Sequence, residues 1–177
     1  GYRVFSDGRF VDVADLRDVW RDDLVSFLIG CSFSFERALL DARIPIRHLE
    51  LGRTVPMYVT SRACAGAGRL AGPMVVSMRP LPETLVERVS AICAGYPGSH
   101  GPPVHVGDPE VIGIRDLARP DFGDPVPIRM GEVPVFWGCG VTPQVVLKRS
   151  GCQWFAAHRP GRMFVSDRPD TITPLVA

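Results

Sequence analysis

The stretch EVPVFWGCGVTPQ, residues 132–144, places the strongest constraint on the fold. An apolar run with the composition of a buried strand ends on Cys139 between two glycines, and a helix-start signal follows at once. The glycines allow a sharp turn and the close approach of another molecule. Thr142 can cap a helix that has Pro143 in its first turn. The stretch therefore predicts a strand, a turn and a helix in succession, with a cysteine displayed at the turn.

A second stretch, GCSFSFE at residues 30–36, repeats this design. A glycine break precedes Cys31, hydroxyl residues stand at a predicted helix start, and Glu36 lies in the first turn. We call residues 30–36 the first elbow and residues 138–144 the second elbow. Two such turns in one small chain predict a site.

The remaining elements follow from apolar spacing and turn residues. An Asp-Gly pair predicts a hairpin of residues 2–5 and 10–13. Helices are expected from 16 to 28, ended by Gly30, from 35 to 42, from 83 to 94 and from 143 to 149. Extended segments are expected at 47–60, 69–79 (ended by Pro80), 104–106, 111–114, 133–137 and 154–165.

Strands and helices alternate in this pattern without strict β-α-β regularity, which predicts a mixed α/β (α+β) protein. The 17 prolines and 18 glycines stand between apolar runs and not in one tract. They indicate a loop-rich fold, and the long Pro/Gly-rich stretch 96–130 is of the kind that often carries function.

The formal net charge of +1 gives no electrostatic argument for binding nucleic acid or an anionic membrane. No apolar stretch approaches the roughly 20 residues that cross a bilayer, and no signal peptide is evident, so a cytoplasmic location is expected. Five cysteines without C-x-x-C spacing argue against a disulfide framework and a zinc knuckle.

Cys139 has the strongest case for a reactive group, because a thiol near a helix N-terminus is expected to have a lowered pKa. Cysteine is also among the most buried residue types, so simple packing of the turn is the competing interpretation. Cys31, among apolar neighbours, has a weaker case as a reactive group and is a candidate substrate contact.

Polar residues of both elbows are candidates for substrate contact. Ser32, Ser34 and Thr142 could hydrogen-bond a substrate, and elbow N–H groups could hold a carboxylate or oxyanion. Helix capping is the alternative for each hydroxyl. Glu36 is a candidate base or a helix-dipole partner, and Gln144 is a candidate substrate amide contact or a surface residue.

His100, His105 and Asp108 lie on the Pro/Gly-rich stretch, and His100 is a candidate substrate contact. Their spacing lacks a strong metal-ligand signature, so no metal is assigned, and an acid/base role for His105 oriented by Asp108 fits the residue types better. Arg79 follows a buried strand and could form a two-pronged contact with a carboxylate, or a structural ion pair.

Several segments carry a family resemblance that spans roughly the whole chain. They are the first elbow, VPMY at 55–58, GPMVVSMRP at 72–80, HG at 100–101, PVH at 103–105, GDP at 107–109 and residues 134–144. The chain thereby resembles the bacterial hydro-lyase family related to D-glutamate cyclase. It departs at residues 157–163, where AHRPGRM stands for the usual THxPGHM, so that His158 is kept and Arg162 replaces a histidine.

The resemblance implies a three-layer α/β/α lobe, formed by residues 1–57 and 133–177, with a smaller two-layer α/β lobe inserted at 58–132. Family members carry a further N-terminal segment, so the chain is expected to lack part of that architecture. An oligomer is a weak further expectation.

The resemblance also implies a carbon–oxygen lyase acting on a small acidic metabolite, with interconversion of D-glutamate and 5-oxo-D-proline as the concrete candidate. His105 or Glu36 would be the base, Cys139 the acid or nucleophile, and Arg79 with the elbow N–H groups the carboxylate holders. His158 could complete the site, and no cofactor is required.

Two alternatives stay open. One is a cysteine-dependent amidase or acyl-transfer enzyme in which Cys139 forms a covalent intermediate. The other is a non-catalytic binding protein for a small carboxylate, which needs the elbows but neither thiol nor imidazole. A truncated copy without activity is also consistent with the sequence.

Overall fold

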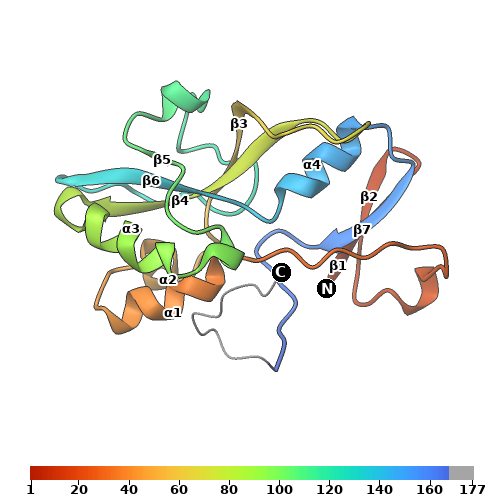
Figure 1. Cartoon of the computed structure of the whole chain (residues 1–177), viewed down its shortest axis with the longest axis horizontal. Coiled ribbons are helices and arrows are strands. Elements are labelled where there is room, and N and C mark those ends of the chain that lie inside the picture. Colours follow the sequence, from red (N-terminus) through yellow and green to blue (C-terminus); the bar gives the residue numbers. More distant parts are fainter. Residues whose placement is uncertain (168–177) are drawn as a thin grey trace.

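The computed structural model describes residues 1–167 and forms two antiparallel sheets (Figure 1). The smaller sheet has the order β2-β1-β7, made of β1 (Tyr2–Ser6), β2 (Arg9–Val13) and β7 (Trp154–His158). Asp7 and Gly8 both have positive φ in the two-residue turn, as a tight hairpin requires. The predicted hairpin is confirmed.

The larger sheet has the order β3-β4-β6-β5. Its strands are β3 (Met57–Ala63), β4 (Pro73–Pro82), β5 (His105–Val106) and β6 (Glu132–Gly138). The strand predictions at 69–79 and 133–137 are confirmed, but β4 runs past Pro80. Pro80 pairs opposite Pro134, and β3 pairs with β4 no further than Ser77, so no neighbouring strand needs the missing N–H.

Helices cover one face of the larger sheet (Figure 1). They are α1 (Phe33–Asp41), α2 (Arg47–Glu50) and α3 (Val86–Ala94), the last preceded by the 3₁₀ turn η2 (Glu83–Leu85). Phe35 and Leu39 of α1 and Val89 of α3 pack against Val135 and Trp137 of β6 in one buried cluster. The mixed α/β class and the helices predicted near 35–42 and 83–94 are confirmed.

The long loop between α3 and β6 begins with the 3₁₀ turn η3 (Pro97–Ser99), which contacts α1, and its later part, with the 3₁₀ turn η4 (Pro109–Ile112), covers the opposite face of that sheet. Ile112 and Val126 from this loop pack on Met78 and Phe136. Residues 111–114 were expected to be extended, and the 3₁₀ turn is a correction. Asp108 accepts a bond from the N–H of Glu110, which favours a turn over a strand here.

The predicted helix at 143–149 is confirmed as α4 (Thr142–Arg149), which joins the two sheets by packing beside β4 (Figure 1). The three-layer lobe and the insertion boundaries at 58 and 132 remain predictions. Residues 168–177 of the predicted main lobe lie outside the described residues. Within residues 1–167, no helix has the length and apolar character needed to cross a membrane.

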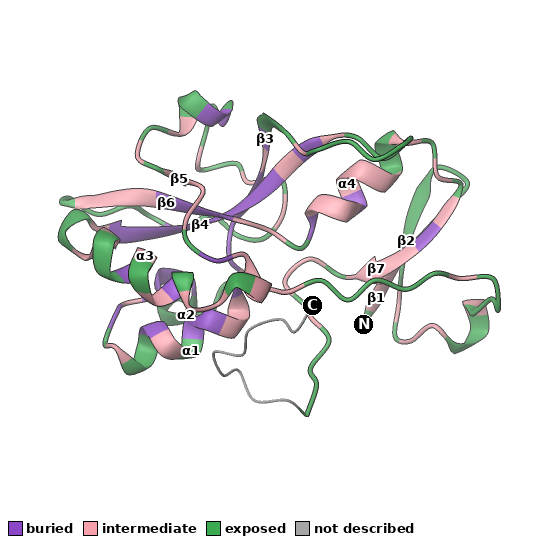
Figure 2. Cartoon of the chain, in the orientation of Figure 1, coloured by how far each residue is buried: buried purple, intermediate pink, exposed green. Residues whose placement is uncertain are grey.

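The helix predicted at 16–28 is wrong. Only the 3₁₀ turn η1 (Arg17–Val19) forms there, and residues 24–31 are irregular. Val25, Phe27 and Leu28 are 78%, 78% and 86% exposed, and Figure 2 shows this segment green. An amphipathic helix draws its stability from packing its apolar stripe, which the described residues do not provide.

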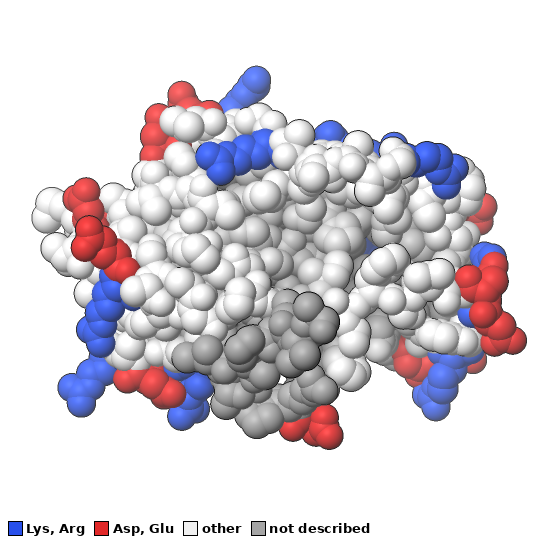
Figure 3. Space-filling model, viewed as in Figure 1, with Lys and Arg blue, Asp and Glu red and all other residues white. Residues whose placement is uncertain are grey.

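Two extended predictions are shorter in the structure. The segment 47–60 begins with helix α2, and β7 ends at His158 and not at residue 165. Charged side chains of both signs lie around the periphery of the face in Figure 3, as a net charge near zero predicts.

Candidate functional site

A buried ionic cluster joins the first elbow to strand β4. Arg79 is fully buried, and its Nε and Nη2 donate to Oε1 of Glu36 in α1, the Nε bond being 3.0 Å long. Nη2 also donates to Ser32 Oγ and Nη1 to Ser77 Oγ, each over 3.1 Å. The interpretation of Arg79 as a structural ion pair is therefore the one that the geometry supports.

Aromatic rings hold the guanidinium from both helix and sheet. The Cζ atom of Arg79 lies 5.3 Å from the ring centroids of Phe35 and Trp137 alike. A delocalised cation is stabilised over such π faces. Arg79 is thus fixed in place, and the described structure does not present it as a carboxylate holder open to a substrate.

Glu36 has a second neighbour that the sequence did not suggest. His48 of α2 is buried, and its Nε2 lies 3.2 Å from Glu36 Oε1. Burial opposes ionisation of Glu36, but His48 and the charge of Arg79 outweigh it and hold the pKa of the carboxyl below its ordinary value. An ionised carboxylate held by two partners is a weak base, so the base role expected for Glu36 loses support.

The two elbows meet beside this cluster. A Cβ atom on Gly140 would lie 3.9 Å from the carbonyl oxygen of Gly30. A Cβ on Gly30 would lie only 1.7 Å from the carbonyl oxygen of Gly98, so η3 packs against the first elbow with no space for a side chain. We call the place where residues 30–32, 98–100 and 138–140 converge the elbow junction.

Cys139 at the junction is a protonated thiol. Burial raises its pKa to about 11, the N–H of Val141 offsets part of this effect, and the neighbouring Cys31 adds to it. The lowered pKa expected from the helix N-terminus is therefore wrong, because loss of solvent outweighs the helix contribution. All five cysteines of the chain are thiols in this structure.

His100 is the imidazole at the junction. It has a left-handed backbone with φ 79°, uncommon for a residue other than glycine, and its Nδ1 would lie 3.6 Å from a Cβ on Gly138. Within residues 1–167 its buried Nε2 has no hydrogen-bond partner. Burial and then the charge of Arg79 lower its pKa, so His100 is neutral near pH 7. Strained backbone and an unsatisfied buried atom are features that mark functional positions.

Ser32 and Thr142 are not used as helix caps. Ser32 is the N-cap residue of α1 but makes no side-chain cap bond, and the N-cap residue of α4 is Val141 and not Thr142. Ser32 accepts from Arg79, whereas Thr142 Oγ1 accepts from the N–H of Val75 and donates to its carbonyl. Both hydroxyls therefore fasten a helix start to strand β4.

Other elbow groups that were candidates for substrate contact form hydrogen bonds within the protein. The N–H of Cys139 donates to Val75 O and the N–H of Ser34 to Cys31 O, each over 3.0 Å. Gln144 is buried, and its Nε2 donates to the carbonyl of His158 over 2.9 Å. Gln144 thus ties α4 to β7, and the alternative of an ordinary surface position is excluded.

His105 and Asp108 do not join the junction. His105 pairs in register with Phe136, and its ring packs on that side chain. Side chains alternate across a strand, so Phe136 and His105 lie on the face opposite Val135 and Trp137. His105 Nε2 contacts the backbone oxygen of Asp108 at 2.7 Å, while the Asp108 carboxylate bonds the N–H of Glu110. The expected carboxylate-oriented base is not formed.

His158 lies in the smaller sheet, where its ring stacks on Tyr2 with centroids 4.6 Å apart. Burial lowers its pKa, and the ammonium group of Gly1 adds to this. No contact in the described part of the chain brings it to the elbow junction. Within residues 1–167 no group of three or more His, Cys, Asp and Glu side chains is arranged to hold a metal ion.

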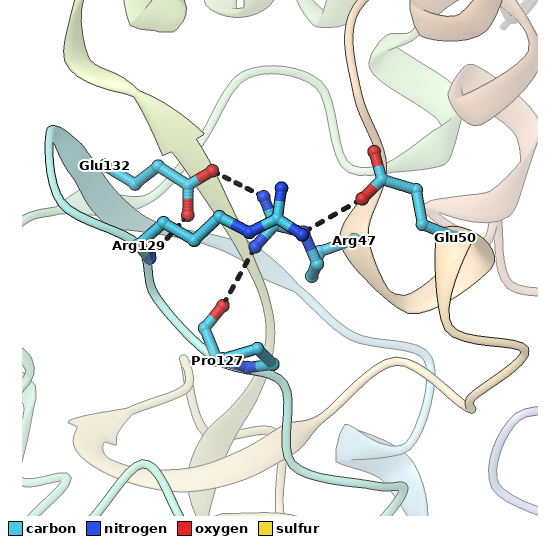
Figure 4. A network of polar contacts seen from close by, with 5 residues as sticks. All are labelled: Arg47, Glu50, Pro127, Arg129 and Glu132. Carbon is cyan, nitrogen blue, oxygen red and sulfur yellow. Dashed lines mark hydrogen bonds and ion pairs between the residues drawn. The ribbon is translucent and has the colours of Figure 1, made fainter.

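A second buried ionic network is structural in character (Figure 4). Arg47 of α2 donates to Glu50 over 3.0 Å, to Glu132 over 2.5 Å and to the carbonyl of Pro127 over 3.3 Å. Glu132 also accepts from the N–H of Arg129. The network fastens α2 to the start of β6, far along the sheet from the elbows.

Two open pockets lie away from the junction. One, of about 430 Å³, lies between the β1–β2 hairpin and α4, with Arg3, Phe10 and Lys148 in its lining. The other, of about 320 Å³, is lined by Tyr58 and residues near Asp116. Neither lining includes Cys139 or His100.

A family model described as D-glutamate cyclase matches residues 25–167. A protein of Nocardioides sp. named "Putative hydro-lyase" is 55% identical over 171 residues, which cover 96% of this chain and 63% of that protein. A protein of the same name from Saccharopolyspora erythraea is 54% identical, with 96% and 67% covered. One from Rubrobacter xylanophilus is 56% identical over 170 residues, with 96% and 66% covered.

The chain belongs to the D-glutamate cyclase family. The three relatives carry the name "Putative hydro-lyase", and the chain spans about two thirds of their length. The resemblance read from the sequence is confirmed.

Proposed function

We propose that the elbow junction is part of the active site of a carbon–oxygen lyase that acts on a small acidic metabolite, through interconversion of D-glutamate and 5-oxo-D-proline. The family membership supports the reaction class. The observation that carries the proposal is that one junction holds both the thiol of Cys139, which is protonated, and the neutral imidazole of His100, whose Nε2 has no hydrogen-bond partner within residues 1–167.

Ring closure needs a base for the ammonium group and an acid for the oxygen that leaves. His100, neutral near pH 7, accepts a proton from the ammonium group. The freed amine attacks the side-chain carboxyl carbon, and Cys139 donates a proton to the departing oxygen. Over the whole reaction one C–N bond forms, one C–O bond breaks, and the two protons lost by the ammonium leave with the oxygen as water.

The buried ionic cluster has a positioning role in this proposal. Arg79 binds Ser32 and Glu36 of the first elbow, so it fixes the loop that carries Cys31 against the second elbow. A reacting geometry held by buried bonds needs little reorganisation during the reaction.

The acyl-transfer alternative has less support, because it requires a thiolate. A thiol with a pKa of about 11 is ionised to roughly one part in ten thousand at pH 7. A general acid, in contrast, has to be protonated. The alternative of a carboxylate-binding protein predicts ligand binding without turnover.

The test is chiral chromatography of D-glutamate and 5-oxo-D-proline after incubation with this chain and, separately, with the whole Nocardioides relative. L-Glutamate is the substrate control. The His100→Gln and Cys139→Ser variants are expected to lose turnover about 100-fold or more. Cys64→Ser, another partly buried thiol, is the matched control and keeps the activity. Absence of turnover in both wild-type proteins would exclude this reaction.

A further inference from the structure

An exposed apolar surface lies in the segment just before the first elbow. Its residues, which we call the 20–29 surface, are all more than half exposed: Trp20, Val25, Phe27, Leu28 and Ile29. Single exposed apolar side chains are common, whereas five within ten positions indicate an interaction surface.

The sequence of this segment carries the pattern of an amphipathic helix that the structure does not form. Trp20, Leu24, Phe27 and Leu28 stand at positions i, i+4, i+7 and i+8, which fall on one face of a helix. The segment is irregular after η1. Such helices depend on packing of the apolar face, and within residues 1–167 that face has no packing partner.

The lengths of the relatives indicate what this partner is. About a third of each relative lies outside the part that this chain matches, while 96% of this chain is matched. The family architecture therefore contains further polypeptide, and the 20–29 surface lies within the matched part. Residue 29 leads directly into Gly30, which packs on Gly98 at the junction.

We propose that the 20–29 surface is the docking face for the portion of the family polypeptide that lies outside this chain. Residues 20–28 become helical when that portion binds. The occupant presents a complementary apolar face and covers the approach to the first elbow. This inference concerns assembly of the fold and does not depend on the proposed reaction.

The test is peptide-resolved hydrogen–deuterium exchange on two proteins. One is this chain. The other is the same chain joined to the portion of the Nocardioides relative that lies outside the match. Amide exchange of residues 20–29 is expected to slow by roughly tenfold or more in the longer protein. Exchange in α3 serves as the internal check that both proteins are folded.

Substitutions separate docking from general stabilisation. Phe27→Asp with Leu28→Asp is expected to remove the protection in the longer protein and to leave α3 unchanged. Val111→Asp is the matched control, because Val111 is also well exposed but lies on η4. Equal exchange of residues 20–29 in the two proteins would overturn the proposal. So would protection in this chain alone that rises with concentration together with a dimeric mass, because the occupant would then be a second copy.

Discussion

The guanidinium of Arg79 on β4 and the carboxylate of Glu36 on α1 form a buried ion pair across 43 positions of sequence. Phe35 and Trp137 close over the same guanidinium. One pair therefore sets the position of helix α1, and of the elbow in front of it, relative to the central strands.

Removal of the Glu36 charge is expected to destabilise the protein strongly. Glu36→Gln leaves the Arg79 cation buried with a neutral partner, which typically costs about 3–5 kcal/mol of unfolding free energy. Urea denaturation followed by circular dichroism measures this loss. Asp41→Asn breaks the exposed Arg37–Asp41 pair on the same helix and should cost no more than about 1 kcal/mol. Equal losses in the two variants would show that the buried Glu36–Arg79 pair stabilises the protein no more than the exposed pair does.

Substitution by alanine is expected to destabilise the protein at Gly30 and to have little effect at Gly140. In Gly30→Ala the new Cβ meets the Gly98 backbone at 1.7 Å, so the first elbow has to move, and a loss of about 1–3 kcal/mol or more is expected. In Gly140→Ala the Cβ makes only an ordinary contact at 3.9 Å. Thermal melts of the two variants provide the comparison. A stable Gly30→Ala protein would contradict the packing of η3 on this elbow.

The stability of the protein is expected to fall below about pH 6.5, in part because of His100. Its pKa is lowered in the folded state from 6.5, so the unfolded chain binds the proton first as the pH falls. The stability from the neutral imidazole is complete above pH 6.5 and is lost between 6.5 and the lowered pKa. Urea unfolding at several pH values should show that the unfolding free energy of His100→Gln depends less steeply on pH than that of the wild-type protein.

His158 contributes in the same direction, because its pKa is lowered too. The urea unfolding of proteins with and without His100 is therefore repeated with His158→Gln in both, so that the contribution of His158 is removed. Glu36 acts in a different range, since its lowered pKa removes stability only below its ordinary value of 4.5. An unchanged slope after removal of His100 would show that its imidazole is not held neutral.

Cys139 is expected to resist alkylation. Raising the thiol pKa from 9.0 to about 11 leaves about a hundredfold less thiolate at a given pH, and burial slows attack further. Mass spectrometry after iodoacetamide treatment at pH 8 measures the modified fraction, with the urea-unfolded protein as reference. Rapid modification of Cys139 in the folded protein would restore the case for a nucleophilic cysteine.

The network around Arg47 predicts a larger loss of stability from removing its buried cation than from neutralising its exposed acid (Figure 4). Arg47→Met leaves the buried Glu132 carboxylate without its cation and should cost about 3–5 kcal/mol. Glu50 is 41% exposed, so Glu50→Gln should cost no more than about 1 kcal/mol. Chemical denaturation of both variants tests this difference.

Local patterns in the sequence predicted most elements of the fold. Strands β4 and β6 and helices α1, α3 and α4 each have a clear apolar period and a nearby turn signal. The helix at 16–28 had the same quality of pattern and does not form, because its stability depends on a packing partner that no local pattern reveals.

The candidate site was predictable in part. The elbows were recognised from Gly, Cys and Ser or Thr at helix starts, and they do converge. Ser77 was missed, although a residue two positions before Arg79 lies on the same face of a strand. His48 gave no signal, because its contact with Glu36 depends on where α2 packs. Strand register separates His105 from the junction, and register is a tertiary property.

The pairing of β1 with β7 has a consequence for the order of folding. Tyr2 lies opposite His158, so strands near the two ends of the described chain are neighbours in one sheet. During synthesis the β1–β2 hairpin must wait, with the apolar side of Phe5 uncovered, until about 150 further residues have left the ribosome. Closure of so long a loop makes completion of this sheet a late and slow event.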